Sequence, residues 1–203
     1  MKNTKVVSIV LAAIALLSFS FKAADLADVF TVSTQKSTLK WVGKKVTGEH
    51  SGTIQLKSGA LEVKNGKLTG GSFEIDMNSI ICEDLEDEGY NAKLIGHLKS
   101  DDFFSVDKFP VAKFDIKKAK AQGGGKYQIT GDLTIKGIKN EITFPAEVNV
   151  EGNTVEANAD IKVDRTKWNI RYGSGSFFDN LGDKTIDDNF ELSLAFVASK
   201  SNN

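Results

Sequence analysis

The chain has 203 residues, of which 26 are basic and 27 acidic, so its formal net charge is −1. Apolar residues make up 40% and charged residues 26%, which are the proportions of a folded globular protein rather than of a disordered one. The balanced charge and the lack of a basic run argue against a phosphate-binding stripe, so we expect no nucleic-acid partner. The length suits one substantial domain.

The first 23 residues have the pattern of a secretory signal peptide. Lys2 and Lys5 precede an apolar run over residues 6–17 that only Ser8 interrupts, and small and polar residues follow it. The run is short for a membrane span. We expect residues 1–23 to be removed on export, with the exact cleavage site left open. The mature protein is then expected in the periplasm or in the extracellular space.

Most of the remaining chain is predicted to be β-strand, because apolar and polar residues alternate and successive side chains of a strand point to opposite faces. In chain order the predicted strands span residues 29–33, 37–47, 53–63, 67–77, 111–120, 126–135, 141–150, 154–164 and 185–198. Alternation is cleanest over residues 126–164, where three runs predict an antiparallel meander. Asn65-Gly66 is the strongest hairpin signal, and a change of parity after Gly59 predicts a β-bulge there.

The strand pattern stops between residues 78 and 110. Acidic residues gather over 83–88, and apolar residues at helical spacing over 90–99 predict one short helix, followed by an aromatic segment. An insertion of about thirty residues is long for a loop, so we expect it to plug or to gate one end of the fold. The candidates for an entrance or lid are Leu94, Leu98, Phe103 and Phe104.

Eight or nine long antiparallel strands, each with one apolar face, close most economically into a barrel, since a barrel has no exposed edge. The interior of an eight-stranded barrel is either filled by side chains or just wide enough for one small ligand. Small residues at the inward positions Gly131, Ala146, Ala157 and Ala159 favour an elongated apolar cavity. The alternative, in which these small residues pack against large ones across the barrel, is equally compatible with the periodicity.

Three segments together resemble the YceI-like family. They are HLKSDDFF at residues 97–104 with Phe109-Pro110 and Phe114 behind it, GDLTIKGIK at 131–139, and Asp164-Arg165 followed by Trp168-Asn169-Ile170. The predicted YceI-like domain spans residues 28–199. The resemblance implies an exported, extended, lipocalin-like antiparallel barrel whose apolar lumen holds a long isoprenoid or other acyl-type lipid.

The lumen of such a barrel is expected to be lined by the inward aromatic and aliphatic residues of the strands. The ligand-binding candidates are Trp41, Phe73, Ile75, Phe114, Tyr127, Ile129, Ile142, Phe144, Phe190, Leu192 and Phe196. The candidates for contact with a polar headgroup are Arg165, Trp168, Arg171 and His97. A guanidinium suits a phosphate. The alternatives are a salt bridge of Arg165 or Arg171 with Asp164 or Asp102, and a structural role for His97 at the helix end.

No catalytic motif is present, and the inward positions carry almost no polar side chain, so we do not expect an enzyme. His50 and His97 lie in different segments, and the acidic run lacks the spacing of a calcium loop. We therefore expect no metal and no cofactor other than the bound lipid. Cys82 is the only cysteine and has no histidine near it in the sequence, which favours a buried structural thiol over a reactive one.

The sequence thus predicts a binding protein of the cell envelope that sequesters or carries a long-chain isoprenoid or fatty lipid. A membrane protein or a membrane surface would be its further partner. The alternative is a solid-cored barrel that acts as a structural or protein-interaction module without a ligand. The identity of the lipid and the direction of its transfer are left open.

Overall fold

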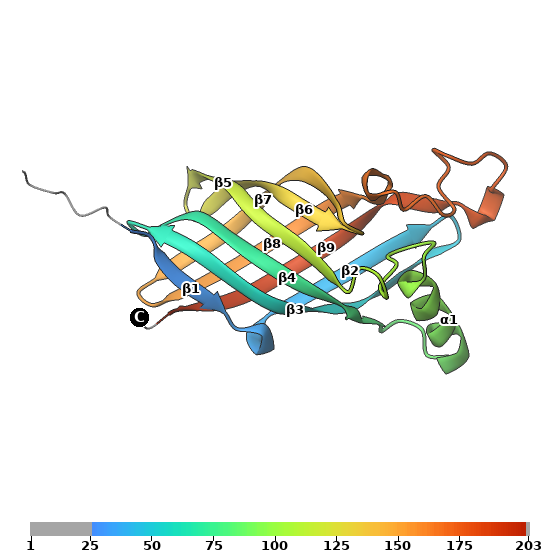
Figure 1. Cartoon of the computed structure of the whole chain (residues 1–203), viewed down its shortest axis with the longest axis horizontal. Helices are drawn as coiled ribbons and strands as arrows, with labels where there is room; N and C mark the ends of the chain where they lie inside the picture. Colours follow the sequence, from blue (N-terminus) through green and yellow to red (C-terminus); the bar gives the residue numbers. More distant parts are fainter. Residues whose placement is uncertain (1–25, 202–203) are drawn as a thin grey trace, which may run out of the picture.

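The computed structural model describes residues 26–201, so the predicted signal peptide lies outside the described residues. The described chain forms one long antiparallel barrel with a single α-helix at one end (Figure 1). Its elements are β1 (Asp28–Val32), β2 (Thr38–Lys45), β3 (Gly48–Lys64), β4 (Lys67–Cys82), α1 (Glu88–Lys99), β5 (Val111–Gly123), β6 (Lys126–Ile135), β7 (Ile138–Glu151), β8 (Thr154–Asp164) and β9 (Ile186–Lys200).

The barrel closes because β2 pairs with both β3 and β9, while each later strand pairs with the next along the chain. Strand β1 also pairs with β3 and β9, at positions further along both strands. Strands β1 and β2 therefore share one place in the wall and are separated only by a 3-10 turn at Thr34–Lys36. Nine strands fill eight places in the wall, which confirms the predicted extended barrel.

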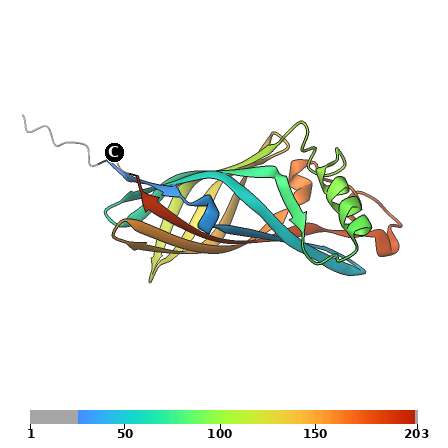
Figure 2. The same cartoon turned by 90° about the horizontal axis from the view of Figure 1, so that it is seen from below.

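The two ends of the barrel differ (Figures 1 and 2). We call the mouth the end that carries α1, the β2–β3 and β6–β7 turns and the segment between β8 and β9. The opposite, closed end carries the β3–β4, β5–β6 and β7–β8 hairpins. Near the closed end the amide of Ser201 donates to the carbonyl oxygen of Val29 (2.9 Å), so the two ends of the described chain meet there. None of the helices within residues 26–201 has the length and apolar character needed to cross a membrane.

Two parts of the predicted strand pattern differ from the structure. Strand β4 runs on to Cys82 instead of ending at residue 77, and β3 begins at Gly48 instead of residue 53, because the two strands pair as far as Gly52 and Cys82. The predicted bulge after Gly59 is misplaced, since the register shifts between Leu56 and Ser58. At Gly59 a Cβ atom would lie 2.9 Å from the ring of Phe73, so this glycine makes room for an aromatic ring.

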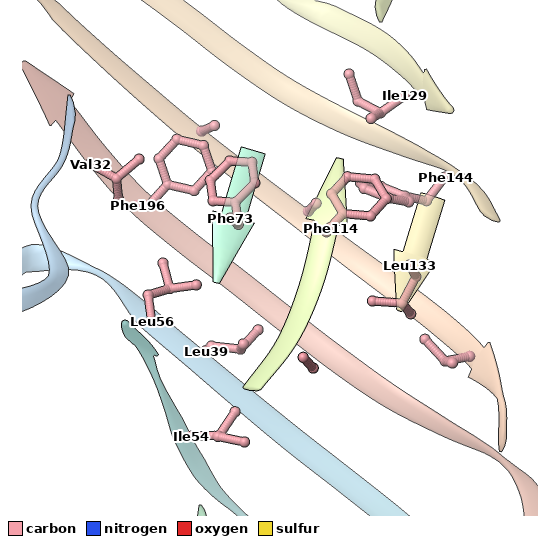
Figure 3. Close-up of a cluster of buried hydrophobic side chains, with 14 of the residues drawn as sticks. Val32, Leu39, Ile54, Leu56, Phe73, Phe114, Ile129, Leu133, Phe144 and Phe196 are labelled. Carbon is pink, nitrogen blue, oxygen red and sulfur yellow. The ribbon is translucent and has the colours of Figure 1, made fainter. Parts of the chain in front are cut away.

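Aromatic rings fill the middle of the barrel (Figure 3). The rings of Phe73 and Phe196 lie 5.4 Å apart between centroids, and those of Phe114 and Phe144 lie 5.5 Å apart. The cavity left beside them is only about 80 Å³. Three of the small inward residues, Ala146, Ala157 and Ala159, line this cavity, whereas the ring of Phe114 occupies the space above Gly131. Small residues are thus matched by a large one at Gly131, and apolar space remains beside the alanines.

Candidate functional site

A cavity of about 410 Å³ lies at the mouth of the barrel. Its strand walls carry Trp41 from β2, Met77 from β4 and Phe190 from β9, and these apolar side chains come from strands that are adjacent or face each other across the bore. Polar side chains are confined to fewer positions, several of them near the β2–β3 turn and the start of β9. The site is thus an apolar pocket with a polar rim.

The insertion between β4 and β5 covers one side of this cavity. Asp87 is the N-cap of helix α1, and its side chain accepts a hydrogen bond from the amide of Tyr90 (2.8 Å). The side chain of Asn91 donates to the carbonyl oxygens of Cys82 (3.0 Å) and Leu85 (3.1 Å), which fixes the helix to the end of β4. The four residues predicted for the entrance all line the cavity: Leu94, Leu98, Phe103 and Phe104.

The residues predicted to line the lumen divide between two cavities. Those at the mouth cavity are Trp41, Ile75, Phe190 and Leu192. Those at the small central cavity are Phe73, Phe114, Ile129, Ile142, Phe144 and Phe196, together with Ile75 and Leu192, which line both. Tyr127 lines neither cavity and is buried towards the closed end, where its hydroxyl accepts a hydrogen bond from the amide of Leu68 (3.4 Å).

Arg165 lies at the wall of the mouth cavity and is almost fully buried, with 2% of its surface exposed. Its guanidinium donates to the carbonyl oxygens of Ile170 (2.8 Å), Asp187 (2.9 Å) and Ile186 (3.1 Å). Burial lowers the pKa of Arg165, and nearby carboxylates, Asp188 first among them, oppose that effect. The guanidinium therefore ties the segment after β8 to the start of β9.

The partner of Arg165 in an ion pair is Asp188, at 3.6 Å, rather than Asp164 or Asp102. The Oδ1 atom of Asp188 that faces Arg165 is buried and accepts no hydrogen bond. Arg165 therefore forms a salt bridge, as the alternative predicted, but its partner is Asp188 and not Asp164 or Asp102. Asp188 lies within the predicted strand 185–198, on the same parity as Phe190, but the period of two gave no sign of its pairing with Arg165.

Of the other headgroup candidates, only His97 lines the mouth cavity. Its ring packs edge-on against Tyr172 (4.4 Å between centroids) and Phe103 (5.1 Å), which forms an aromatic cluster between α1 and the segment after β8.

The indole of Trp168 is fully buried and donates to the carbonyl oxygen of Leu133 (3.1 Å). Arg171 is exposed and its guanidinium lies over the ring of Phe177 (4.4 Å). Trp168 and Arg171 line neither cavity.

Several polar residues of the rim were absent from the sequence prediction. Lys44 and Lys45 reach the cavity from the end of β2, and Lys184 reaches it from the segment before β9. The hydrogen bond and the charge of Glu191 raise the pKa of Lys44, which keeps this ammonium group charged. His50, on β3, also lines the cavity. Lys44, Lys45 and His50 lie around the β2–β3 turn, which the sequence located without showing that it borders the cavity, and no sequence signal pointed to Lys184.

A closed antiparallel barrel whose middle is largely filled by side chains and whose mouth holds an apolar pocket is the architecture of lipocalin-like binding proteins. A family model described as the YceI-like domain matches residues 30–198, and the chain belongs to the YceI-like family. This confirms the resemblance seen in the three sequence segments.

Curated relatives match over shorter stretches. A UPF0312 protein of Shewanella denitrificans is 34% identical over 86 residues, which cover 42% of this chain and 42% of that protein. A UPF0312 protein of Vibrio campbellii is 32% identical over 90 residues, covering 41% of this chain and 48% of that protein. The matched stretch thus spans less than half of the length of these relatives.

Solved structures match nearly the whole barrel. Burkholderia cenocepacia BcnA is 26% identical, with a TM-score of 0.61 over 83% of this chain and 99% of that one. A polyisoprenoid binding domain from Saccharophagus degradans, implicated in plant cell wall breakdown, has the same TM-score over 86% of this chain and 99% of that one. Its identity is 13%, so this likeness shows a shared fold.

Proposed function

We propose that the protein binds one long-chain isoprenoid or acyl-type lipid in the mouth cavity and sequesters or carries it in the cell envelope. The observation that carries this proposal is the cavity itself: about 410 Å³, walled by apolar side chains and open at one end of the barrel. That volume lies within the range of small-molecule sites, roughly 300–1,000 Å³. The polyisoprenoid binding domain with the same fold supports the choice of ligand class.

Binding in such a site draws on the removal of apolar surface from water. Each CH₂ group buried contributes about 0.8 kcal/mol, so the affinity grows with the length of chain that the pocket accepts. The aromatic rings in the middle of the barrel limit that length, because only a small cavity remains behind them. A polar headgroup would lie at the rim, near Lys44, Lys45 and Lys184.

Binding is favoured over catalysis because three polar side chains at the cavity, Arg165, His97 and His50, already contact other groups of the protein. Arg165 donates to three backbone carbonyl oxygens, and the ring of His97 packs between two aromatic rings. The His50 ring is hydrogen-bonded to Asp84 (2.8 Å). None of these contacts leaves a base aimed at a nucleophile within the apolar pocket.

The test is native mass spectrometry of the purified protein, followed by organic extraction and identification of any lipid. Leu192 lines the cavity, whereas its neighbour Ser193 lies on the outer face of β9 and is exposed. We expect Leu192→Trp to lose the bound lipid and Ser193→Trp to keep it, with both variants folded by circular dichroism. Wild-type protein that carries no lipid and takes up none from vesicles would instead favour the ligand-free module.

A further inference from the structure

Three side chains that could bind a metal ion, those of His50, Cys82 and Asp84, lie together beside the mouth, where β3 and β4 pair. Nδ1 of His50 is 2.8 Å from Oδ2 of Asp84, and Sγ of Cys82 is 3.2 Å from Oδ1 of the same carboxylate. The three potential ligand atoms all lie within 4.8 Å of one another. The cysteine without a histidine near it in the sequence thus has one near it in space.

The backbone holds these three residues together before any ligand arrives. Gly52 pairs with Cys82, and a Cβ atom at residue 52 would lie 1.9 Å from the carbonyl oxygen of Ile81, so only glycine allows the strands to approach this closely. Beyond this pair, the amide of Ser51 donates to Oδ1 of Asp84 (2.7 Å). The segment after β4 is further held by Asn91 of α1.

We propose that His50, Cys82 and Asp84 form a binding site for a divalent transition metal ion of the zinc type. An imidazole nitrogen, a thiolate sulfur and a carboxylate oxygen are the three kinds of protein ligand that zinc takes. Three protein ligands leave the fourth position of a tetrahedral ion open. This mixture of nitrogen, sulfur and oxygen donors disfavours calcium and magnesium, which require oxygen ligands.

The cluster is accessible to an ion and suited to a positive charge. The side chains of His50 and Asp84 are 31% and 33% exposed, while Cys82 is buried behind them. Burial raises the pKa of Asp84, but the amide of Ser51 and the ring of His50 outweigh burial and hold this pKa at about 2. Asp84 therefore supplies a permanent negative charge at neutral pH.

Binding changes the protonation of the other two ligands. The thiol of Cys82 donates to Asp84 in the free protein, and its pKa is raised by burial and by that carboxylate. On binding, a bond forms between sulfur and the ion, and the thiol proton leaves to solvent. With a neutral imidazole, the ring proton of His50 moves from Nδ1 to Nε2 as Nδ1 takes the ion. About one proton is thus released per ion, and the affinity rises with pH.

The test uses the purified, reduced protein titrated with Co²⁺, which reports sulfur ligation by a thiolate-to-metal charge-transfer band, and with Zn²⁺ in competition. We expect one ion per chain and a band that is absent in Cys82→Ser. His50→Gln and Asp84→Asn should each weaken binding at least about tenfold, because even the partners of metal ligands change affinity by 10–100-fold. The matched control is Glu83→Gln, the exposed acid between two of the ligands, which should bind as the wild type does.

Two results would overturn the proposal. One is a wild-type protein that shows no charge-transfer band at millimolar Co²⁺. The other is a band that keeps its affinity in His50→Gln and Asp84→Asn, since the thiol would then act alone. As a second measurement, Zn²⁺ should raise the Tm of the wild type and leave that of a folded Cys82→Ser variant unchanged. The site does not depend on the lipid proposal, and lipid-free protein serves equally well.

Discussion

A Cβ atom at Gly131 would lie 2.6 Å from the Cζ atom of Phe114, so the ring of Phe114 packs directly onto the bare backbone of the neighbouring strand. Position 131 looked like a gap in the wall, but it is the surface on which an aromatic ring rests. The ring reaches over this glycine of β6 and lies against Phe144 of β7, with 5.5 Å between the ring centroids. Rings packed in this way fill part of the middle of the barrel, where the smaller of the two cavities lies.

Gly131→Ala is expected to destabilise the barrel by about 1–3 kcal/mol, the usual cost of overpacking a filled core. The added carbon meets the ring of Phe114 and also the carbonyl oxygen of Asp115, at 2.5 Å, so a rotation of the ring alone cannot relieve the clash. Urea denaturation measures the change. Gly43→Ala is the control, because nothing lies within 4 Å of a Cβ atom there. Equal unfolding midpoints for both variants would contradict the packing argument.

Arg165→Met is expected to cost about 3–5 kcal/mol, because it leaves the partly buried carboxylate of Asp188, whose Oδ1 atom is fully buried, without its counter-charge. Three backbone carbonyl oxygens also lose their donor. Thermal and urea unfolding measure the loss, and the second change Asp188→Asn should recover part of it. The comparison variant is Arg171→Met, which removes an exposed guanidinium and should stay within about 0.5 kcal/mol of the wild type.

The stability of the metal-free protein should fall in acid through Asp84. Its pKa in the folded state is about 2, below the ordinary value of 3.8. A carboxylate with a lowered pKa stabilises the fold above its unfolded pKa, and this contribution is lost as the pH falls through the folded value. The difference in unfolding free energy between wild type and Asp84→Asn should therefore shrink between pH 3.8 and about 2. A difference that stays constant over that window would show that the hydrogen bonds to Asp84 do not stabilise the fold.

The wall of the barrel was predictable because a period of two decides which side chains face inward, and a slip by one residue would expose the whole apolar face. This is why the meander from β6 to β8 was assigned correctly. The insertion was recognised because the alternation stopped, and its helix followed from apolar residues at helical spacing. Strand alternation and helical spacing are properties of short segments, and they predicted the strands and the helix of those same segments.

The position of the cavity was not predictable, because it depends on where the ring of Phe114 settles across the strands. The cluster of His50, Cys82 and Asp84 was not predicted, for a related reason. His50 and Cys82 are joined by the pairing of β3 with β4, whose register shifts at three places, so counting residues from the hairpin does not bring them together. Such contacts are properties of the closed barrel, and no short segment of the chain contains them.

The two ends of the described residues meet at the closed end, which has a practical consequence. The amide of Ser201 donates to the carbonyl oxygen of Val29, and the side chain of Lys200 forms an ion pair with Asp28 (2.9 Å), so β1 begins beside the end of β9. A bead, a sensor chip or a fluorescent fusion partner joined there would attach at the end of the barrel opposite to α1, and the mouth would stay free (Figure 2).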